Sequence, residues 1–253
     1  MKEFGLIGTS LRHSFSKDYF NQFFEDNNID ACYKNYELDS IEELPKLIEK
    51  NNLICGLNVT IPFKQVISSY LDVINPKAKE VGAVNVIEII RENGHTKLIG
   101  HNTDILGFKY SISPMLKKYH TDALILGTGG ASKAVDYVLR ELSINTLFVS
   151  RSKKSKNKII TYDELNEDLF KKHLLIINCT PCGTWPNIDT YPPINYQWTT
   201  SKHIFYDLVY NPQLTSFMQK AKEKGATIKN GLEMLHLQAE YAWKIWNSNK
   251  SDI

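Results

Sequence analysis

An apolar strand of this chain ends in the sequence Asn58-Val59-Thr60-Ile61-Pro62-Phe63-Lys64. Side chains alternate across a strand, so Asn58 and Thr60 are expected to share one face. Pro62 has no amide hydrogen to give to a sheet ladder, so strand pairing should stop there. Polar side chains that gather at the end of a buried strand indicate a ligand site.

The residues after Pro62 are predicted to open a helix from Phe63 to Val66, with Lys64 in its first turn. A lysine is unfavourable there, because the amino end of a helix carries a partial positive charge. The common alternative for a single lysine is a solvated surface residue. Other parts of the chain must therefore decide whether Lys64 has a function.

Length and composition indicate a globular protein of two domains. The chain has 253 residues and a mass of 29.0 kDa, near the size at which one core gives way to two. Its 42% apolar and 23% charged residues are typical of folded proteins. A net charge of +2 is too small to favour nucleic acid as a partner, although a small anionic ligand could be attracted locally.

Targeting and cysteine patterns favour the cytoplasm. The first residues, Met1 to Leu6, resemble a strand rather than a secretory signal, and no apolar run has membrane-spanning length. The four cysteines are unevenly spaced, which argues against a disulfide framework. The pair Cys179 and Cys182 has no second Cys or His pair nearby, so neither zinc nor redox use is favoured and no metal is predicted.

Strands and helices alternate along the first part of the chain, which predicts a largely parallel sheet. Two serines, Ser14 and Ser16, precede the first helix; they could point together at a polyol, although capping of the helix is favoured for either one alone. Asn93-Gly94 is a strong hairpin turn. The predicted elements are strands at 4–8, 33–38 and 54–60, and helices at 17–27 and, behind a capping box at Ser40, at 41–50.

A glycine cluster indicates a dinucleotide site. The apolar strand 121–127 runs into Gly127-Thr128-Gly129-Gly130-Ala131 and a helix to about Leu142, which suits a pyrophosphate at a helix amino end. The spacing departs from the usual pattern, because Ser132 holds the third glycine's position. The next strand ends at Ser150-Arg151-Ser152; an arginine there accommodates a 2′-phosphate, so NADP is preferred over NAD. A solvated basic loop is the simpler explanation for the lysines at 153–158.

The remaining elements place further candidates. Asp104 precedes a helix at 105–118 that Pro114 should kink or divide, and it could serve simply as a cap or first-turn carboxylate. A strand at 174–179 leads to a turn with Thr180, expected beneath the cofactor. The last clear strand is predicted at 203–210, followed by helices at 214–224 and from Asn230 to Trp246, where Gln238 interrupts an apolar stripe.

Taken together, the motifs resemble those of the shikimate dehydrogenase family over nearly the whole chain. They are His13-Ser14-Phe15-Ser16, Asn58 to Lys64, Gly82 to Asn85, Asn102-Thr103-Asp104, Gly127 to Ala131, Tyr206 to Tyr210, and Gly231 to Ala239. The resemblance implies an α/β fold of two domains with an interdomain active-site cleft. A mainly parallel substrate-binding and catalytic domain at 1–104 would be completed by a C-terminal helix at 232–253, and a Rossmann-like NADP-binding domain would occupy 105–231.

The resemblance also implies roles for individual residues. Lys64 and Asp104 match the catalytic pair. The positions that match substrate-binding residues are Ser14, Ser16, Thr60, Asn85, Tyr210 and Gln238. Those that match cofactor-binding residues are Gly127, Gly129, Gly130, Ala131, Ser150, Arg151, Ser152, Thr180, Gly231 and Met234. Asn58 has no assigned role and is expected mainly to brace its loop.

The activity implied is the reversible NADPH-dependent reduction of 3-dehydroshikimate to shikimate, in the chorismate and aromatic amino-acid route, by a monomer or homodimer. Four positions depart from the family's usual residues: Lys17, Val86, Ser150 and Ser155. The last two weaken the expected preference for NADP. The alternatives are an NAD-using quinate or shikimate dehydrogenase of the same fold and a nucleotide-binding regulator without turnover, although a regulator has no need of Lys64, Asp104 and Gln238 together.

Overall fold

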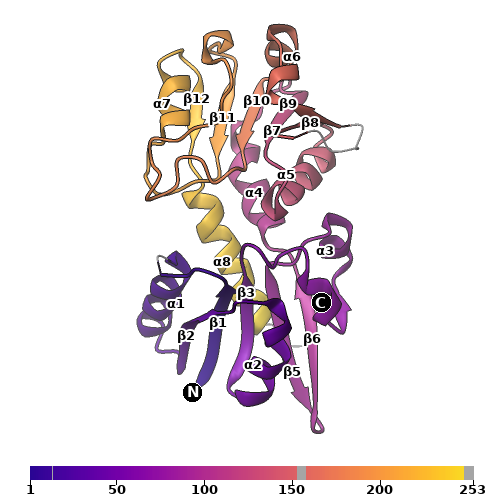
Figure 1. Cartoon of the computed structure of the whole chain (residues 1–253). Coiled ribbons are helices and arrows are strands. Elements are labelled where there is room, and N and C mark those ends of the chain that lie inside the picture. Colours follow the sequence, from indigo (N-terminus) through magenta and orange to yellow (C-terminus); the bar gives the residue numbers. More distant parts are fainter. Residues whose placement is uncertain (13, 153–157, 248–253) are drawn as a thin grey trace. The chain divides into compact units, whose positions relative to one another are not determined.

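The computed structural model describes residues 1–12, 14–152 and 158–247 (Figure 1). Internal contacts divide the chain into two compact units, with unit 1 formed by Met1–Thr103 and Gln238–Ile253, and unit 2 by Asp104–Leu237. Three stretches lie outside the described residues: His13, the lysine-rich segment 153–157, and 248–253, the last part of the predicted C-terminal helix. Each unit is built on its own six-stranded sheet, which agrees with the predicted α/β class.

Unit 1 contains a mixed sheet with the strand order β2-β1-β3-β5-β6-β4. Its strands are β1 (Lys2–Gly8), β2 (Ala31–Glu37), β3 (Ile54–Val59), β4 (Val73–Ile74), β5 (Val86–Glu92) and β6 (His95–His101). The β1–β2, β1–β3 and β4–β6 pairs are parallel, whereas β3–β5 and β5–β6 are antiparallel. The predicted hairpin turn is confirmed, because Glu92 pairs with His95 and the two residues between them, Asn93 and Gly94, have positive φ angles of 49° and 78°.

The helices of unit 1 include α1 (Phe15–Asp26), α2 (Leu44–Lys50) and α3 (Pro76–Val81). The capping box at Ser40 is confirmed, although it opens a short 3₁₀ turn at Ile41–Glu43 ahead of α2. Helix α8 (Leu232–Asn247) begins in unit 2 and ends in unit 1, since the boundary between the units falls after Leu237.

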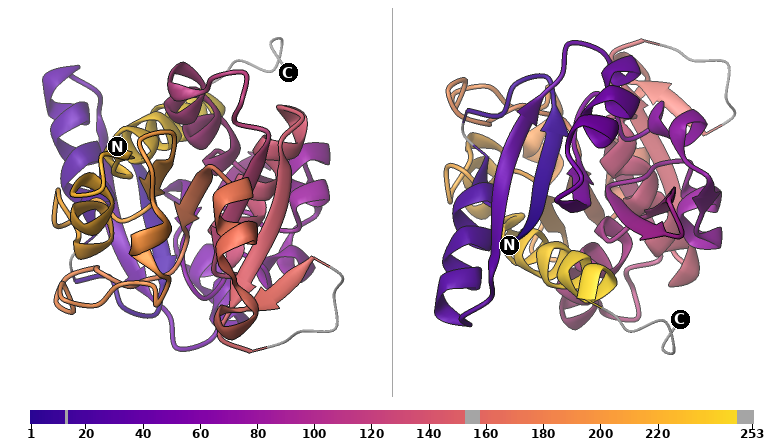
Figure 2. Two further views of the ribbon diagram at one scale, coloured as in Figure 1. Left: turned by 90° about the horizontal axis from the view of Figure 1, so that it is seen from above. Right: turned by 90° about the horizontal axis from the view of Figure 1, so that it is seen from below.

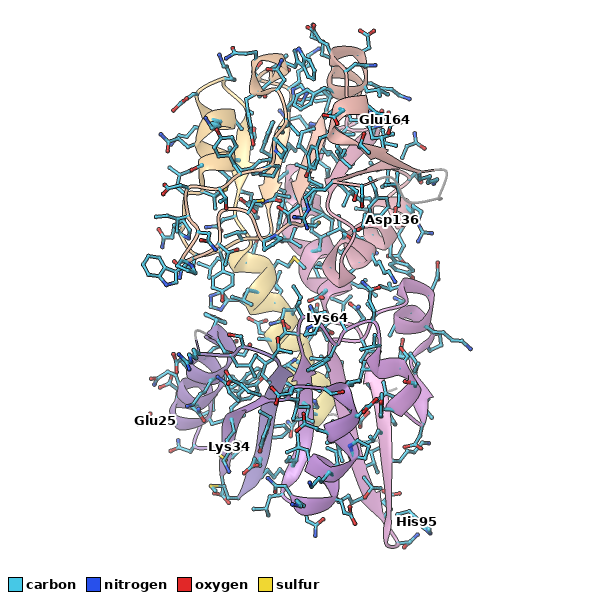
Figure 3. All side chains as sticks on the ribbon, in the orientation of Figure 1. Glu25, Lys34, Lys64, His95, Asp136 and Glu164 are labelled. Atoms are coloured by element: carbon cyan, nitrogen blue, oxygen red, sulfur yellow. The ribbon has the colours of Figure 1, made fainter. Side chains whose placement is uncertain are left out.

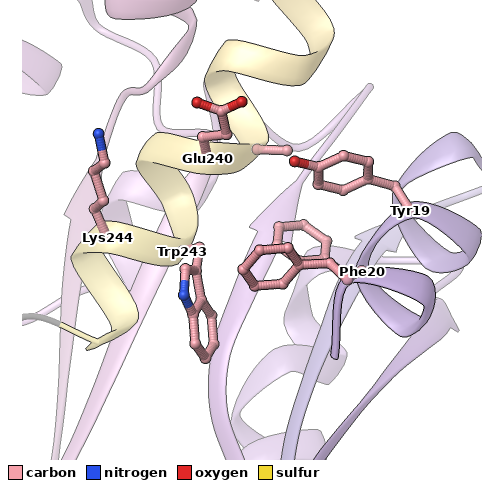
Figure 4. A pocket seen from close by; sticks show the side chains of 7 residues that line it. Tyr19, Phe20, Glu240, Trp243 and Lys244 are labelled. Atoms are coloured by element: carbon pink, nitrogen blue, oxygen red, sulfur yellow. The ribbon is translucent and has the colours of Figure 1, made fainter. Parts of the chain in front are cut away.

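Aromatic side chains join α1, β1 and the end of α8 within unit 1. The rings of Phe4 and Trp246 stack with centroids 4.9 Å apart, and Trp246 Nε1 donates to the Ile87 carbonyl at 3.0 Å. A groove between α1 and α8 remains open beside this core (Figure 4). The residues that line it are Tyr19, Phe20, Phe23, Ala239, Glu240, Trp243 and Lys244. The packing fixes α8 against the sheet that carries the candidate substrate residues.

Unit 2 contains an all-parallel sheet with the order β12-β11-β10-β7-β8-β9 (Figure 2). Its strands are β7 (Asp122–Leu126), β8 (Asn145–Ser150), β9 (Ile159–Thr161), β10 (Leu175–Asn178), β11 (Ile204–Asp207) and β12 (Thr227–Lys229). Its helices include α4 (Asp104–Ile112), α5 (Gly130–Glu141), α6 (Glu167–Lys172) and α7 (Ser216–Lys222). With β7 numbered as the first strand, this is the doubly wound strand order. The order of the strands along the sheet reverses between the first and the fourth strand, and in such folds ligands bind at that point, beyond the carboxyl ends of the strands.

Several predicted elements differ in the structure. The helix expected at 105–118 ends at Ile112, because Pro114 lies in a separate 3₁₀ turn at Ser113–Met115. The strand expected to run to Tyr210 ends at Asp207, and it is not the last, since β12 follows. β9 and β12 have three residues each, which is too short for an alternating pattern to stand out. Among the described residues, no helix is long and apolar enough to span a membrane.

Candidate active site

Lys64 lies in a series of turns, so the prediction of a helix from Phe63 to Val66 is wrong. The Phe63 amide donates to the Thr60 carbonyl at 2.9 Å, and the Lys64 carbonyl accepts from the Val84 amide at 2.8 Å. In a helix that carbonyl would accept from the amide four residues ahead, but a distant loop takes that bond instead. Phe63 is buried, and the half-buried Lys64 follows it directly, in the loop after β3 (Figure 3).

Asn85 is buried beside this loop and uses both its main chain and its side chain. Its backbone carbonyl accepts from the Val59 amide at 2.8 Å and from Asn58 Nδ2 at 3.4 Å. Its side-chain oxygen accepts from the Thr103 amide at 2.7 Å, and its Nδ2 donates to Thr103 Oγ1 at 3.0 Å. These bonds fix the orientation of the amide and tie it to the residue that precedes Asp104.

Ser14 occupies the N-cap position of α1 without making a capping bond through its side chain. Its backbone is extended, with φ −71° and ψ 117°, and its buried hydroxyl oxygen has no hydrogen-bond partner among the described residues. The capping interpretation is therefore wrong for this hydroxyl. A buried hydroxyl without a partner is unfavourable, and a polar ligand would relieve that cost. Ser16 is only 9% exposed, and its side chain lies next to the hydroxyl of Tyr33.

The carboxyl ends of β1 and β3 bring these residues to one edge of the unit 1 sheet. The Thr60 amide donates to the Ile7 carbonyl at 3.0 Å. A Cβ on Gly8 would lie 2.6 Å from Thr60 Cγ2, so only glycine allows this approach. The edge gathers five of the residues with predicted roles, namely Ser14, Ser16, Thr60, Lys64 and Asn85. Gln238 is the first residue of the unit 1 part of α8.

Asp104 opens α4 and is 5% exposed. A carboxylate in the first turn is favoured by the helix dipole, so the simple structural interpretation of this residue holds alongside any role in catalysis. Asp104 belongs to unit 2 and follows Thr103, the last residue of the first segment of unit 1.

The glycine turn of unit 2 follows β7, at the reversal in strand order. Gly127 has φ +104°, and a Cβ there would lie 3.2 Å from the main chain of Cys179, so both conformation and space require glycine. Gly129 is the N-cap of α5, and a Cβ on it would meet no atom within 4 Å. Ser132 is fully buried and its hydroxyl donates to the Gly129 carbonyl at 2.7 Å. A serine can therefore replace the third glycine, and the turn fits a pyrophosphate at a helix amino end.

The next strand, β8, ends at Ser150, opposite Thr161 of β9. Arg151 and Ser152 follow and are exposed. The positive charge of Arg151 acts on Tyr162, but burial of the ring dominates and raises the Tyr162 pKa to about 12. In doubly wound folds the end of this second strand faces the ribose of a bound dinucleotide, and Arg151 directly follows that strand end.

A buried carboxylate that the sequence did not single out lies at the ends of β10 and β11. Asp207 is fully buried and accepts from Thr215 Oγ1 at 2.6 Å, from Asn178 Nδ2 at 2.9 Å and from the Val209 amide at 3.0 Å. Asn178 Oδ1 in turn accepts from the amide and hydroxyl of Thr180, at 3.0 and 2.6 Å. Burial raises the pKa of Asp207 to about 6. These hydrogen bonds hold the two loops that carry Thr180 and Tyr210 in place.

Gly231 allows α8 to begin close to the loop that follows β11. A Cβ at this position would lie 2.1 Å from the Leu208 carbonyl oxygen, and the Gly231 amide donates to the Val209 carbonyl at 3.1 Å. Met234 follows within the first turn of α8 and is buried. The cysteines are all thiols, and burial raises the pKa of Cys179 well above its ordinary value. Within 1–12, 14–152 and 158–247, no three His, Cys, Asp or Glu side chains form a group that could hold a metal.

Comparison with known proteins gives consistent matches. Residues 6–87 match a family model described as the shikimate dehydrogenase substrate binding domain. A Clostridium botulinum (strain Hall) protein named shikimate dehydrogenase (NADP(+)) is 37% identical over 97% of this chain and 96% of its own. The structure of shikimate dehydrogenase 1 from Peptoclostridium difficile is 38% identical, covers 100% of this chain and 94% of that chain, and has a TM-score of 0.83. The structure of the Thermus thermophilus shikimate 5-dehydrogenase in complex with NADP(H) and shikimate is 27% identical, with a TM-score of 0.82 and coverage of 98% and 94%.

Proposed function

Because this chain belongs to the shikimate dehydrogenase family, we propose that it catalyses the reversible NADPH-dependent reduction of 3-dehydroshikimate to shikimate, in the route to chorismate and the aromatic amino acids. The observation that carries the proposal is the edge of the unit 1 sheet, where two serines, a threonine, an asparagine and a lysine gather at the ends of β1 and β3. A polyol with a carboxylate needs this kind of surface, because each of its oxygens must find a polar partner.

The cofactor, when bound, supplies hydride to the ketone carbon of the substrate. The protein must provide a proton to the ketone oxygen as negative charge develops there. We assign that role to Lys64, with Asp104 as its catalytic partner. General acid catalysis of this kind is typically worth roughly a hundred- to ten-thousand-fold in rate.

The other assignments follow the chemistry of the residues present. Ser14, with a buried hydroxyl that has no partner among the described residues, would bind a polar group of the substrate. The remaining substrate contacts proposed are Ser16, Thr60, Asn85, Tyr210 and Gln238. Those proposed for NADP(H) are Gly127, Gly129, Gly130, Ala131, Ser150, Arg151, Ser152, Thr180, Gly231 and Met234. In this division the proposed substrate contacts lie in unit 1 except Tyr210, which lies in unit 2 with the proposed cofactor contacts.

The decisive assay adds shikimate and NADP to the purified protein and follows absorbance of the reduced nicotinamide. Lys64→Ala should lower kcat by at least a hundredfold while changing the KM for shikimate much less, because the lysine acts mainly on the developing charge. Lys77→Ala is a matched control, since this exposed lysine lies outside the proposed site. Wild-type protein that produces no absorbance change across a broad pH range would refute the activity, and near-normal kcat in Lys64→Ala would remove that residue from catalysis.

The competing assignment is an NAD-using dehydrogenase that also accepts quinate. Initial rates with each cofactor and each polyol separate the two; Arg151 favours NADP, and together with Ser14 and Ser16 it favours the strict shikimate and NADP form. A monomeric or homodimeric state and a cytoplasmic location are further parts of this proposal; gel filtration with light scattering and cell fractionation test them.

A further inference from the structure

Tyr33, on β2, is a buried tyrosine whose hydroxyl lies between two parts of the proposed substrate site. Only 1% of the residue is exposed, and its ring stacks on Phe20 with centroids 4.7 Å apart and planes 10° from parallel. The hydroxyl donates to Asn58 Oδ1 at 2.7 Å, and the side chain of Ser16 lies next to it. Tyr33 thus links the first turn of α1 to the end of β3.

The bonds in this chain can be oriented in only one way. The Asn85 carbonyl can only accept, so Asn58 must direct its Nδ2 there, as the 3.4 Å bond shows. Asn58 Oδ1 is then left for Tyr33, and the tyrosine proton points to it. The orientation of the Asn58 amide therefore follows from the main chain of Asn85, and the orientation of the Tyr33 hydroxyl follows from Asn58.

A phenylalanine would fill the same apolar space without a polar group to satisfy. Tyr33 lies in a cluster that includes Phe4, Phe20, Phe24 and Trp246, where packing alone gives no reason for a hydroxyl. A buried hydroxyl is tolerated only where its hydrogen bonds offset its desolvation. Its hydrogen bond goes to Asn58, which holds the main chain of Asn85, and beside it lies Ser16, which is proposed to bind substrate.

We propose that Tyr33 is a positioning residue for substrate binding. It does not touch the substrate; its hydroxyl keeps Ser16 at a fixed distance from the end of β3, where Thr60 and Asn85 lie. The inference rests on the proposed function, since it gives Ser16 a substrate to bind. Asn58 is the group that holds the Tyr33 hydroxyl in place.

Tyr33→Phe tests the proposal. We expect the KM for shikimate to rise roughly five- to tenfold, the factor expected for the loss of about one hydrogen bond. The kcat should stay within about twofold and the KM for NADP should not change. The control is Tyr196→Phe, which removes another buried hydroxyl, one that donates to the Pro192 carbonyl at 2.9 Å in unit 2. An equal rise in KM in both variants, or no rise in Tyr33→Phe, would overturn the proposal.

A double-mutant cycle shows whether Tyr33 acts through Ser16. Adding Tyr33→Phe to Ser16→Ala should raise the KM for shikimate by less than about twofold, because the effects of replacing neighbouring residues are not additive. Full additivity would mean that Tyr33 has only a general structural role. Asn58→Ala gives the same cycle from the other end of the chain of bonds if Tyr33→Phe does not fold. Wild-type protein that fails to reduce NADP with shikimate would count against the proposed function, before any variant is compared.

Discussion

Replacing Asp207 by asparagine should change how the stability of unit 2 depends on pH. Burial raises the Asp207 pKa from 3.8 to about 6, so between these values the folded protein holds a proton that the unfolded chain releases. Stability then falls as pH rises through this window, because the folded state binds more protons than the unfolded state. Above about pH 6 Asp207 is ionised in both the folded and the unfolded state, so it no longer makes stability depend on pH.

The size of the effect follows from the two pKa values. The difference between about 6 and 3.8, at roughly 1.4 kcal/mol per pH unit, amounts to about 3 kcal/mol. Because Asp207 is fully buried, solvent screening does not reduce this figure. The amide oxygen of the substituted side chain can still accept from Asn178 and Val209. The free energy of unfolding of the variant should therefore rise relative to that of wild type, by up to about 3 kcal/mol, as pH is raised from below 4 to 7.

The assay is urea unfolding of Asp207→Asn and wild type, followed by circular dichroism at closely spaced pH values from 3.5 to 7.5. Asp122→Asn is the matched control, because the contribution of this residue to stability should change with pH in the opposite direction. Burial would raise the Asp122 pKa, but hydrogen bonds from Thr121 and Asn145 and the charge of Lys172 outweigh it and the pKa is lowered. That carboxylate stabilises the fold above its ordinary pKa and loses this effect as pH falls. Parallel stability curves for wild type and Asp207→Asn between pH 4 and 6 would refute the argument.

Two further variants test the cofactor turn and the adenosine end. Gly127→Ala should lower the melting temperature by several degrees and raise the KM for NADP at least tenfold, because φ +104° is strained for alanine and the new Cβ would lie 3.2 Å from the Cys179 main chain; unchanged melting would show that the turn adapts. Arg151→Gln should raise the KM for NADP roughly ten- to a hundredfold, the range for a lost charged hydrogen bond, and leave the KM for NAD and shikimate unaltered. An equal loss with NAD would contradict a role at the 2′-phosphate.

Local chemistry in the sequence was enough to predict the elements with strong turn or capping residues. Asn93-Gly94 forms the expected hairpin turn, and the glycines at 127–130 lie between β7 and α5. These residues favour one backbone conformation almost regardless of their surroundings. The same local arguments failed at Lys64 and Ser14. A tertiary contact decides at Lys64, whose carbonyl accepts from the Val84 amide, whereas the Ser14 hydroxyl simply makes no capping bond.

The buried polar residues were the hardest to predict. Tyr33 lies within a strand of mixed polarity and Asp207 at the end of an apolar strand, where an aromatic ring or a single acidic residue usually reflects packing or a turn. Their hydrogen-bond partners are 25 and 29 residues away at Asn58 and Asn178. Nothing in the local sequence pairs residues across such distances, so only the three-dimensional structure reveals these networks.

Because the Lys64 carbonyl accepts from the Val84 amide, the backbone of this loop loses its conformational freedom when the protein folds, not when a ligand binds. With Phe63 and Ile67 buried on either side, the backbone that carries the lysine is ordered during folding. The entropy of fixing it, about 1–2 kcal/mol per residue, is then already spent before a ligand arrives. This part of the cost therefore does not fall on ligand binding, so the backbone of this part of the site is preorganised.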